Sequence, residues 1–340
     1  MLLETPVFRL PTPVFQLRSF NSGLPTSGFQ QKNPHLCTIL NLTNLFSFPI
    51  KYHEPVFRPP SEAYSLILQV TIGCSWNRCA FCEMYTSKKF NFRPEEEIFT
   101  EIDKMAEFFP DTRKIFLADG NAMVLSSEKL LRILAYLNQK FPRLTRISAY
   151  AIPKDLKNKT LDELTALQKA GLKLIYVGIE TGDDVLLDLI NKGETAESTF
   201  NSMNKAKEAG IKSSVMIING LGGRKYSSLH AMNSAKVVNL VQPEFLSTLV
   251  LSFPFGVGHF RTKFGGEFIE MNILDLLHEQ KLFISNLNLN ETVFRSDHAS
   301  NYLVLKGILN RDQQNLIAQL NMAIQAPEHA NLRKEWERGL

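Results

Sequence analysis

From Tyr64 onward, short apolar runs alternate with longer segments whose apolar residues recur at helical spacing. Short apolar runs bounded by polar residues are typical of buried strands, and helices between them are typical of connections in a parallel sheet. The pattern predicts strands over residues 65–71, 114–118, 146–151, 172–179, 211–218 and 245–253. We therefore expect an α/β fold in which helices cover a parallel sheet.

The helices between these strands have recognisable ends. Thr160 with Glu163 forms a predicted capping box, and Thr195 is a predicted cap for the next helix. Gly171 and Gly210 stand where helices stop, each within the repeated order Ala-Gly-apolar-Lys that leads into a strand. Six repeated βα units, fewer than the eight of a closed barrel, predict an open, partial (βα)6 TIM-like barrel.

The two ends of the chain differ from this alternating region. Residues 1–55 are rich in proline and keep neither helical nor strand periodicity, which predicts an extended or disordered arm. The barrel core is expected over residues 60–255. Residues 256–340 are predicted to form an irregular and helical extension that closes the barrel, with one amphipathic helix over residues 312–324.

Composition and charge exclude several classes of protein. No apolar run approaches the ~20 residues of a membrane helix, so a cytoplasmic protein without membrane contact is expected. The net charge of +4 is small, and nucleic acid is not indicated. Four cysteines in 340 residues are too few for a disulfide framework, and their clustering favours metal binding in a reducing compartment.

Three of the cysteines, Cys74, Cys79 and Cys82, lie within nine residues directly after the first predicted strand. In βα barrels the chemistry lies at the carboxyl ends of the strands. Three thiolates can hold three irons of a cubic iron–sulfur cluster and leave the fourth iron open, whereas structural metal sites normally have four ligands. The alternatives are a zinc site completed by Cys37 or His53, or buried thiols.

Over residues 60–255 the chain resembles the radical S-adenosylmethionine superfamily. The resemblance rests on a three-cysteine loop after strand one, six βα units and glycine-containing strand ends. The usual pattern there is Cys-x3-Cys-x2-Cys, and this chain has one residue more between Cys74 and Cys79. Phe81 matches the aromatic residue often found before the last cysteine. The resemblance implies a 4Fe-4S cluster on the three cysteines and S-adenosylmethionine on the open iron. It also implies reductive cleavage to a 5'-deoxyadenosyl radical, which takes a hydrogen atom from an unidentified substrate, and an electron donor such as flavodoxin or ferredoxin.

The same resemblance suggests residues that contact the cofactor. The segment Asp119-Gly120-Asn121 is similar to the Gly-Gly-Glu region that contacts the methionine amino group. Glu180 matches an acid near the ribose hydroxyls, and Asn219-Gly220 matches main chain beside adenine. The alternative for these acids is helix capping, and for the glycine a tight turn.

Two further sets of residues are weaker candidates. Basic side chains expected near the cofactor carboxylate, unless they are ordinary solvated charges, are Lys88, Lys89, Arg93, Arg224 and Lys225. His298 and Asn301 lie in a polar stretch of the C-terminal part and are candidates to face the substrate, although a lone histidine is more often structural.

Three functions follow from these observations. The first is a radical enzyme acting on a small molecule, and the second is modification of RNA or protein by the same chemistry. Methylthiotransferases of the superfamily carry a second cysteine trio, whereas only Cys37 remains here, so that activity is not expected. The third is a non-catalytic iron–sulfur or zinc-binding protein. Substrate identity lies in side chains that have no readable code.

Overall fold

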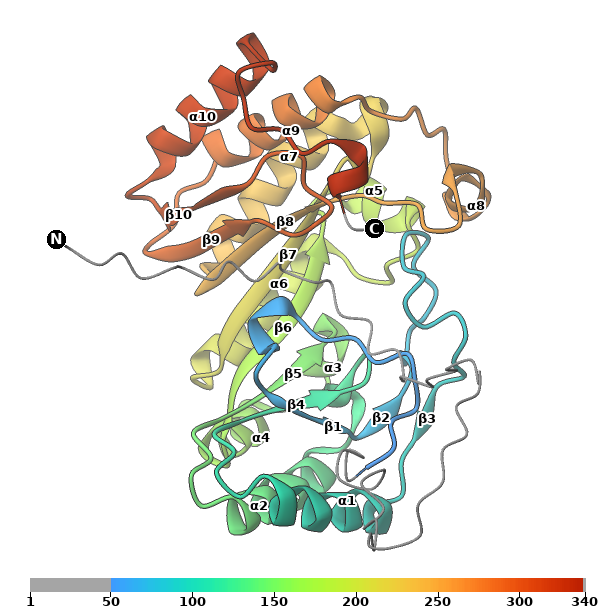
Figure 1. Cartoon of the computed structure of the whole chain (residues 1–340), viewed down its shortest axis with the longest axis vertical. Coiled ribbons are helices and arrows are strands. Elements are labelled where there is room, and N and C mark those ends of the chain that lie inside the picture. The colour runs from blue at the N-terminus through green and yellow to red at the C-terminus, as the bar shows by residue number, and fades with distance from the viewer. Residues whose placement is uncertain (1–49, 339–340) are drawn as a thin grey trace, which may run out of the picture.

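An eight-stranded sheet organises residues 50–338, the part of the chain that this computed structural model describes (Figure 1). The strand order is β1-β4-β5-β6-β7-β8-β9-β10, with every neighbouring pair parallel except β9 and β10. The strands are β1 (Leu66–Gln69), β4 (Lys114–Ala118), β5 (Arg146–Ala151), β6 (Leu172–Glu180), β7 (Lys212–Asn219), β8 (Phe245–Val250), β9 (Thr292–Ser296) and β10 (Leu305–Leu309). The six predicted strands are thus confirmed, and the α/β class with them.

Helices connect consecutive strands, as the alternation predicts. They are α1 (Glu95–Phe108), α2 (Ser127–Lys140), α3 (Pro153–Lys157), α4 (Leu161–Lys169), α5 (Asp184–Leu189), α6 (Ala196–Glu208), α7 (Gly223–Val241), α8 (Val257–Lys263), α9 (Ile273–Ser285) and α10 (Gln313–Gln325). Three short 3-10 helices are η2 (Pro60–Glu62), η3 (Ala122–Val124) and η4 (Glu335–Glu337). The capping boxes at Thr160 and Thr195 are both present, and Gly171 and Gly210 have positive φ angles.

The main hydrophobic core lies between one face of the sheet and the helices. Alternate strand residues such as Leu68, Leu117 and Ile175 point into it and are fully buried. Burial of apolar surface at ~25 cal/mol per Å² makes this face the chief source of stability. The other, inner face of β1, β4 and β6 carries a second cluster around Phe116 and Tyr176, which also contains Val56.

Val56 belongs to a segment that precedes the barrel and packs on its inner face. Tyr52 Oη donates to Ile67 O at 2.8 Å, and the main chain of His53 exchanges hydrogen bonds with the Gln69 side chain. Residues 50–55, expected in the extended or disordered arm, are therefore in irregular but hydrogen-bonded contact with β1. The remainder of that arm, residues 1–49, lies outside the described residues.

The C-terminal part differs from its prediction. It contains helix α10 close to the predicted range, with Leu316 and Leu320 buried, but it also contains strands β9 and β10. Both were missed because they are only five residues long and carry Arg295, Lys306 and Gly307 among their apolar positions. The sheet remains open, since among the described strands β1 pairs only with β4 and β10 only with β9. Closure of the barrel by the C-terminal part stays a prediction.

Within residues 50–338, no helix combines the length and apolar character needed to cross a membrane.

Candidate active site

The three cysteines lie on a loop, residues 73–90, whose two ends are joined by a small antiparallel sheet. β2 (Thr71–Ile72) pairs with β3 (Asn91–Phe92) in the register Thr71 to Phe92 and Ile72 to Asn91. This cysteine loop starts at the carboxyl end of the first strand, as predicted. Cys74, Cys79 and Cys82 are all partly buried free thiols.

The extra residue of the cysteine loop is accommodated by a left-handed turn and an aromatic contact. Asn77 has φ 44° and donates from Nδ2 to Tyr85 O at 3.1 Å, a conformation that asparagine tolerates better than most residues. Trp76 donates from Nε1 to Asn191 O at 2.8 Å. A Cβ at Gly193 would lie 2.3 Å from the Trp76 ring. The loop therefore packs directly on the turn between α5 and α6.

The end of β4 fixes the other side of the cysteine loop. Gly120 N donates to Gly73 O at 3.1 Å, and a Cβ at Gly120 would lie 2.8 Å from Cys74 Cβ. The buried Asp119 Oδ2 accepts from Lys88 Nζ at 2.6 Å and from Gly73 N at 3.0 Å. Glycine is thus required at position 120 by close contact, and Asp119 is in part a structural anchor of the loop.

Three buried polar atoms beside this loop have no hydrogen-bond partner among the described residues: Tyr85 Oη, Asp119 Oδ1 and Asn121 Oδ1. The Asn121 amide donates to Ser75 Oγ at 3.0 Å and to Asp155, which leaves its oxygen free to accept. Buried polar atoms without partners are uncommon in folded proteins. Two oxygen acceptors and a hydroxyl in this position fit a ligand that carries an ammonium group.

Glu180 ends β6 in an unusual backbone conformation. Its φ is 67°, and the strand register shifts between Gly178 and Glu180. Gly178 makes room for this side chain, since a Cβ there would lie 1.8 Å from Glu180 Oε1. The carboxylate is almost buried and receives Lys192 Nζ at 3.1 Å. A non-glycine residue held in this region of φ indicates a functional constraint.

Lys192, on the turn between α5 and α6, joins Glu180 to the cysteine loop. Its ammonium lies 5.7 Å from the centroid of the Phe81 ring. Burial lowers the pKa of Lys192, but Glu180 and the thiols of Cys79 and Cys82 outweigh burial and raise it overall. The sequence analysis missed this residue, because a single lysine twelve positions after Glu180 has no distinguishing pattern.

The thiols of Cys79 and Cys82 are poor acids in this setting. Burial raises the pKa of Cys79 to about 12, against the lowering effect of Lys192, and Cys82, Glu180 and Cys74 raise it further. Burial likewise raises the pKa of Cys82. Metal ligation by these residues therefore requires loss of a proton from each thiol.

Three thiols on one loop are the donor type that iron–sulfur clusters use. Among residues 50–338, no three His, Cys, Asp or Glu side chains stand close enough together to hold a metal ion. That statement covers the three cysteines themselves as well as His53, a proposed fourth zinc ligand, while Cys37 lies outside the described residues. The donor chemistry and the glycine-lined contact with β4 fit a cluster held from this loop.

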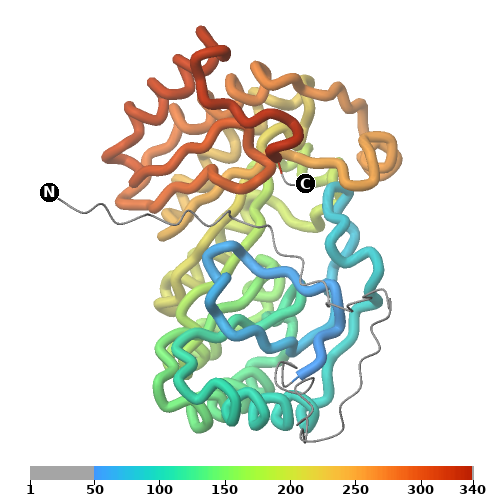
Figure 2. The backbone as a smooth tube through the Cα atoms, viewed as in Figure 1, coloured from blue at the N-terminus to red at the C-terminus, as the bar shows by residue number. Residues whose placement is uncertain are grey.

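An apolar cluster covers the cysteine loop on the side of the C-terminal part. Ala80 and Phe81 pack with aromatic residues around α8, namely Phe253, Phe260, Phe264 and Phe268. Figure 2 shows the loop rising towards α8, where Phe255 N donates to Glu83 Oε2 at 3.1 Å. This cover excludes water from one side of the loop.

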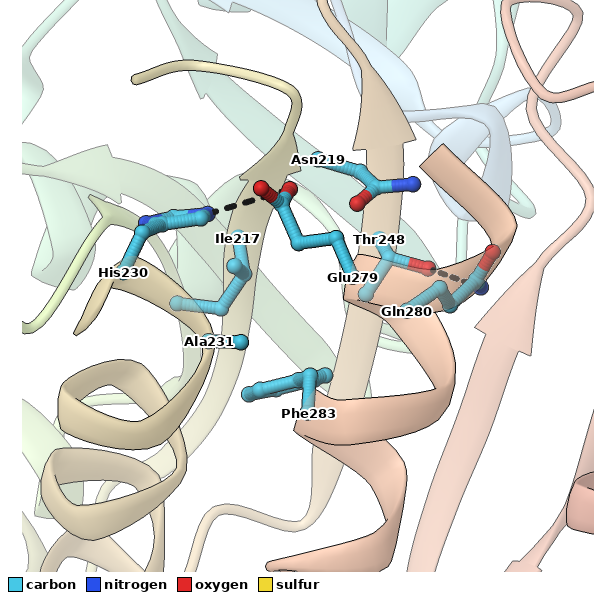
Figure 3. A pocket seen from close by; sticks show the side chains of 8 residues that line it. All are labelled: Ile217, Asn219, His230, Ala231, Thr248, Glu279, Gln280 and Phe283. Atoms are coloured by element: carbon cyan, nitrogen blue, oxygen red, sulfur yellow. Dashed lines mark hydrogen bonds and ion pairs between the residues drawn. The ribbon is translucent and has the colours of Figure 1, made fainter. Parts of the chain in front are cut away.

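Asn219 and Gly220, predicted beside adenine, lie at the end of β7 and make their contacts with α9. Asn219 donates from Nδ2 to Leu276 O at 3.1 Å, and Gly220 N donates to Glu279 Oε1 at 2.6 Å. Figure 3 shows Asn219 beside the Glu279 side chain. The amide nitrogen of Asn219 and the main-chain N–H of Gly220 are thus both engaged with α9.

His298 and Asn301 belong to the loop between β9 and β10. His298 Nδ1 lies 2.9 Å from Ser300 Oγ, and Asn301 donates from Nδ2 to Thr248 O at 2.8 Å. Burial lowers the pKa of His298, and Arg333 lowers it further. Both residues tie this loop to neighbouring segments, and their contact with substrate stays a prediction.

The basic residues suggested for the cofactor carboxylate are mostly engaged elsewhere. Lys88 pairs with Asp119, and the buried Arg93 pairs with Glu101 at 2.7 Å. The other pairs join Arg224 to Asp275 at 2.7 Å and Lys225 to Glu267 at 3.3 Å, while Lys89 is exposed. Lys192 and Lys154 are lysines from other segments that lie against aromatic residues of the cysteine loop, Phe81 and Trp76 respectively.

Known proteins are similar to part of this chain. The heme chaperone HemW of Bacillus subtilis is 27% identical over 143 residues, which are 42% of this chain and 37% of that protein. The tRNA-2-methylthio-N(6)-dimethylallyladenosine synthase of Treponema denticola is 25% identical over 191 residues, 52% of this chain and 41% of that protein. The chain thus spans about two-fifths of the length of these curated relatives.

The solved structure of coproporphyrinogen III oxidase (HemN) from Escherichia coli, described as a radical SAM enzyme, has a similar fold. It superposes with a TM-score of 0.51 and 19% identity over 65% of this chain and 52% of that one. Residues 68–233 match the family model of the radical SAM superfamily. That match runs from β1 through the cysteine loop into α7, and the chain belongs to the radical S-adenosylmethionine superfamily.

Proposed function

We propose that this chain binds a 4Fe-4S cluster through Cys74, Cys79 and Cys82 and cleaves S-adenosylmethionine reductively. The proposal rests on the contacts of the cysteine loop with the ends of two strands. One strand end presents buried acceptors without partners, and the other carries a buried ion pair. In the superfamily, the bound cluster supplies the electron that cleaves S-adenosylmethionine, and the 5'-deoxyadenosyl radical takes a hydrogen atom from the substrate.

Different residues of this chain bind different parts of S-adenosylmethionine. Asp119 Oδ1 and Asn121 Oδ1 are acceptors for the methionine ammonium. Lys192 supplies a positive charge for the carboxylate, and such charge-assisted bonds are the strong ones. Glu180 accepts from the ribose hydroxyls, and the main chain at Gly220 lies along the adenine.

The apolar cover around α8 has a separate role. Phe81 and Phe260 belong to a packed cluster against the cysteine loop. Exclusion of water protects a carbon radical from side reactions and strengthens the electrostatic contacts of the site. We assign the substrate to the inner face of the sheet, reached from the open side of the barrel, and the electron to a donor such as flavodoxin or ferredoxin.

A non-catalytic iron–sulfur role is the second candidate. It is favoured by the similarity to a relative named as a heme chaperone. Both candidates share the cluster, and they differ in whether S-adenosylmethionine is consumed. RNA modification of the methylthio type has less support, because this chain has one cysteine outside the trio.

The test is binding of S-adenosylmethionine to anaerobically reconstituted protein, followed by the electron paramagnetic resonance of the reduced cluster. We expect the signal to change on addition of S-adenosylmethionine, because the open iron gains ligands. Glu180→Gln should keep the cluster and weaken binding ~10-fold, while the exposed Glu197→Gln, on α6, should behave as wild type. A signal that S-adenosylmethionine leaves unchanged would contradict the proposal.

A further inference from the structure

A buried acid on α9, outside the family match, contacts the end of β7. Glu279 is 3% exposed, and its Oε1 accepts from Gly220 N at 2.6 Å. The family model ends at residue 233, so α9 lies outside the matched residues. Figure 3 shows the Glu279 carboxylate pointing from α9 towards the end of β7 and the His230 ring.

A buried histidine on α7, His230, lies near the same carboxylate and is 1% exposed. His230 Nε2 lies 3.7 Å from Glu279 Oε1, and its Nδ1 lies 2.8 Å from Thr181 Oγ1. Thr181 directly follows Glu180. The 3.7 Å separation is beyond hydrogen-bond distance, and burial lowers the pKa of His230 to about 4, so the neutral ring packs between Glu279 and the end of β6 without forming an ion pair.

The environment of Glu279 disfavours the charged form of its carboxyl group. Burial raises the pKa of Glu279 to about 7, against hydrogen bonds from Ser227 and from Gly220 N, which lower it. A cavity of about 10 Å³ beside it, lined by residues that include Asn219 and Thr248, has room for one water molecule. Of the residues that line this cavity, His230 and Glu279 titrate, and burial lowers the pKa of His230 to about 4.

Buried carboxylates seldom stabilise a fold, because desolvation offsets the gain from their hydrogen bonds. We propose that Glu279 is a positioning residue, which holds the main chain at Gly220 in the arrangement that binds S-adenosylmethionine. This inference rests on the proposed function. It adds a residue from the C-terminal part to a site otherwise built by the family core.

The test compares S-adenosylmethionine affinity by calorimetry in four reconstituted proteins: wild type, Glu279→Ala, Glu279→Gln and His278→Gln. Glu279→Ala leaves Gly220 N without its acceptor and should weaken binding ~10-fold. Glu279→Gln keeps an oxygen that can accept from Gly220 N and should recover most of that loss. His278 is exposed on the same helix, and its variant should match wild type.

Wild-type affinity in Glu279→Ala would overturn the inference. If that variant does not fold, amide hydrogen exchange of residues 217–222 in Glu279→Gln replaces it. Exchange at Gly220 should be faster than in wild type, because an amide oxygen accepts more weakly than a carboxylate, and an unchanged rate would overturn the inference. Absence of binding in wild type itself, with the cluster intact, contradicts the proposed function instead, so the two failures are distinguishable.

Discussion

The carboxylate of Glu180 occupies the space that a side chain at Gly178 would need, with a Cβ there only 1.8 Å from Glu180 Oε1. Gly178→Ala must therefore displace the carboxylate and break its contact with Lys192, which lies 3.1 Å away. We expect ~10-fold weaker binding of S-adenosylmethionine with normal iron content. The control is Gly258→Ala, where an added Cβ meets nothing within 4 Å. Equal affinities in wild type and Gly178→Ala would show that the position of Glu180 is unimportant.

Gly120→Ala tests the contact between β4 and the cysteine loop. Its Cβ would lie 2.8 Å from Cys74 Cβ and 2.8 Å from Tyr85 Cε2. The loop has to move, because such contacts are not tolerated in a packed interior. We expect less than half of the wild-type iron and sulfide after reconstitution, while Gly258→Ala reconstitutes fully. Full cluster content in Gly120→Ala would mean that the cysteines do not depend on this contact.

Lys192→Met tests the positive charge beside the cysteine loop. The substitution keeps a similar apolar stem and removes the partner of Glu180 and the cation near Phe81. Loss of a charge-assisted bond predicts ~10- to 100-fold weaker S-adenosylmethionine binding, with Lys192→Arg retaining part of it. Lys169→Met, on the exposed face of α4, is the control. Equilibrium dialysis that finds equal affinity for Lys192→Met and wild type would remove Lys192 from the site.

Glu279 also predicts a pH dependence of stability. Its pKa rises from 4.5 in the unfolded chain to about 7 in the folded protein, chiefly through burial. The folded state thus holds this proton more tightly than the unfolded chain does. The stabilisation by the protonated carboxyl group is full below about pH 4.5 and is lost as the pH rises through about 7. Glu279→Gln has no carboxyl group to titrate at this position. Its free energy of unfolding should therefore rise relative to that of wild type by ~3 kcal/mol between pH 4.5 and 7.5.

Urea denaturation of both proteins, prepared alike, at pH 5 and pH 7.5 measures this difference. His230 is present in both proteins, so its own opposite dependence largely cancels in the comparison. A stability difference that stays constant with pH would show that Glu279 ionises normally.

The strands and the cysteine loop could be predicted because their signals are local. Each of the six strands is an apolar run between helical segments, and Cys74, Cys79 and Cys82 are close in sequence. Strands β9 and β10 could not, because five-residue strands with charged and glycine positions resemble loops. They are defined by pairing with other strands, β9 with β8 and β10 with β9.

The site residues divide in the same way. The resemblance to the superfamily suggested Glu180 as a site residue, but its contact with Lys192 could not be predicted, because the turn after α5 folds back onto the cysteine loop. Asn219 was also predicted, but its amide bonds α9, an element with no motif of its own. Contacts that join distant elements leave no periodic trace in the sequence.

The central claim is tested most directly by the formation of 5'-deoxyadenosine. Wild type, reconstituted anaerobically with iron and sulfide and then given dithionite and S-adenosylmethionine, should release 5'-deoxyadenosine, measured by liquid chromatography. Cys79→Ala should release none, because the cluster loses one of its three thiolates. Wild type that carries a complete 4Fe-4S cluster and forms no 5'-deoxyadenosine under these conditions would contradict the account.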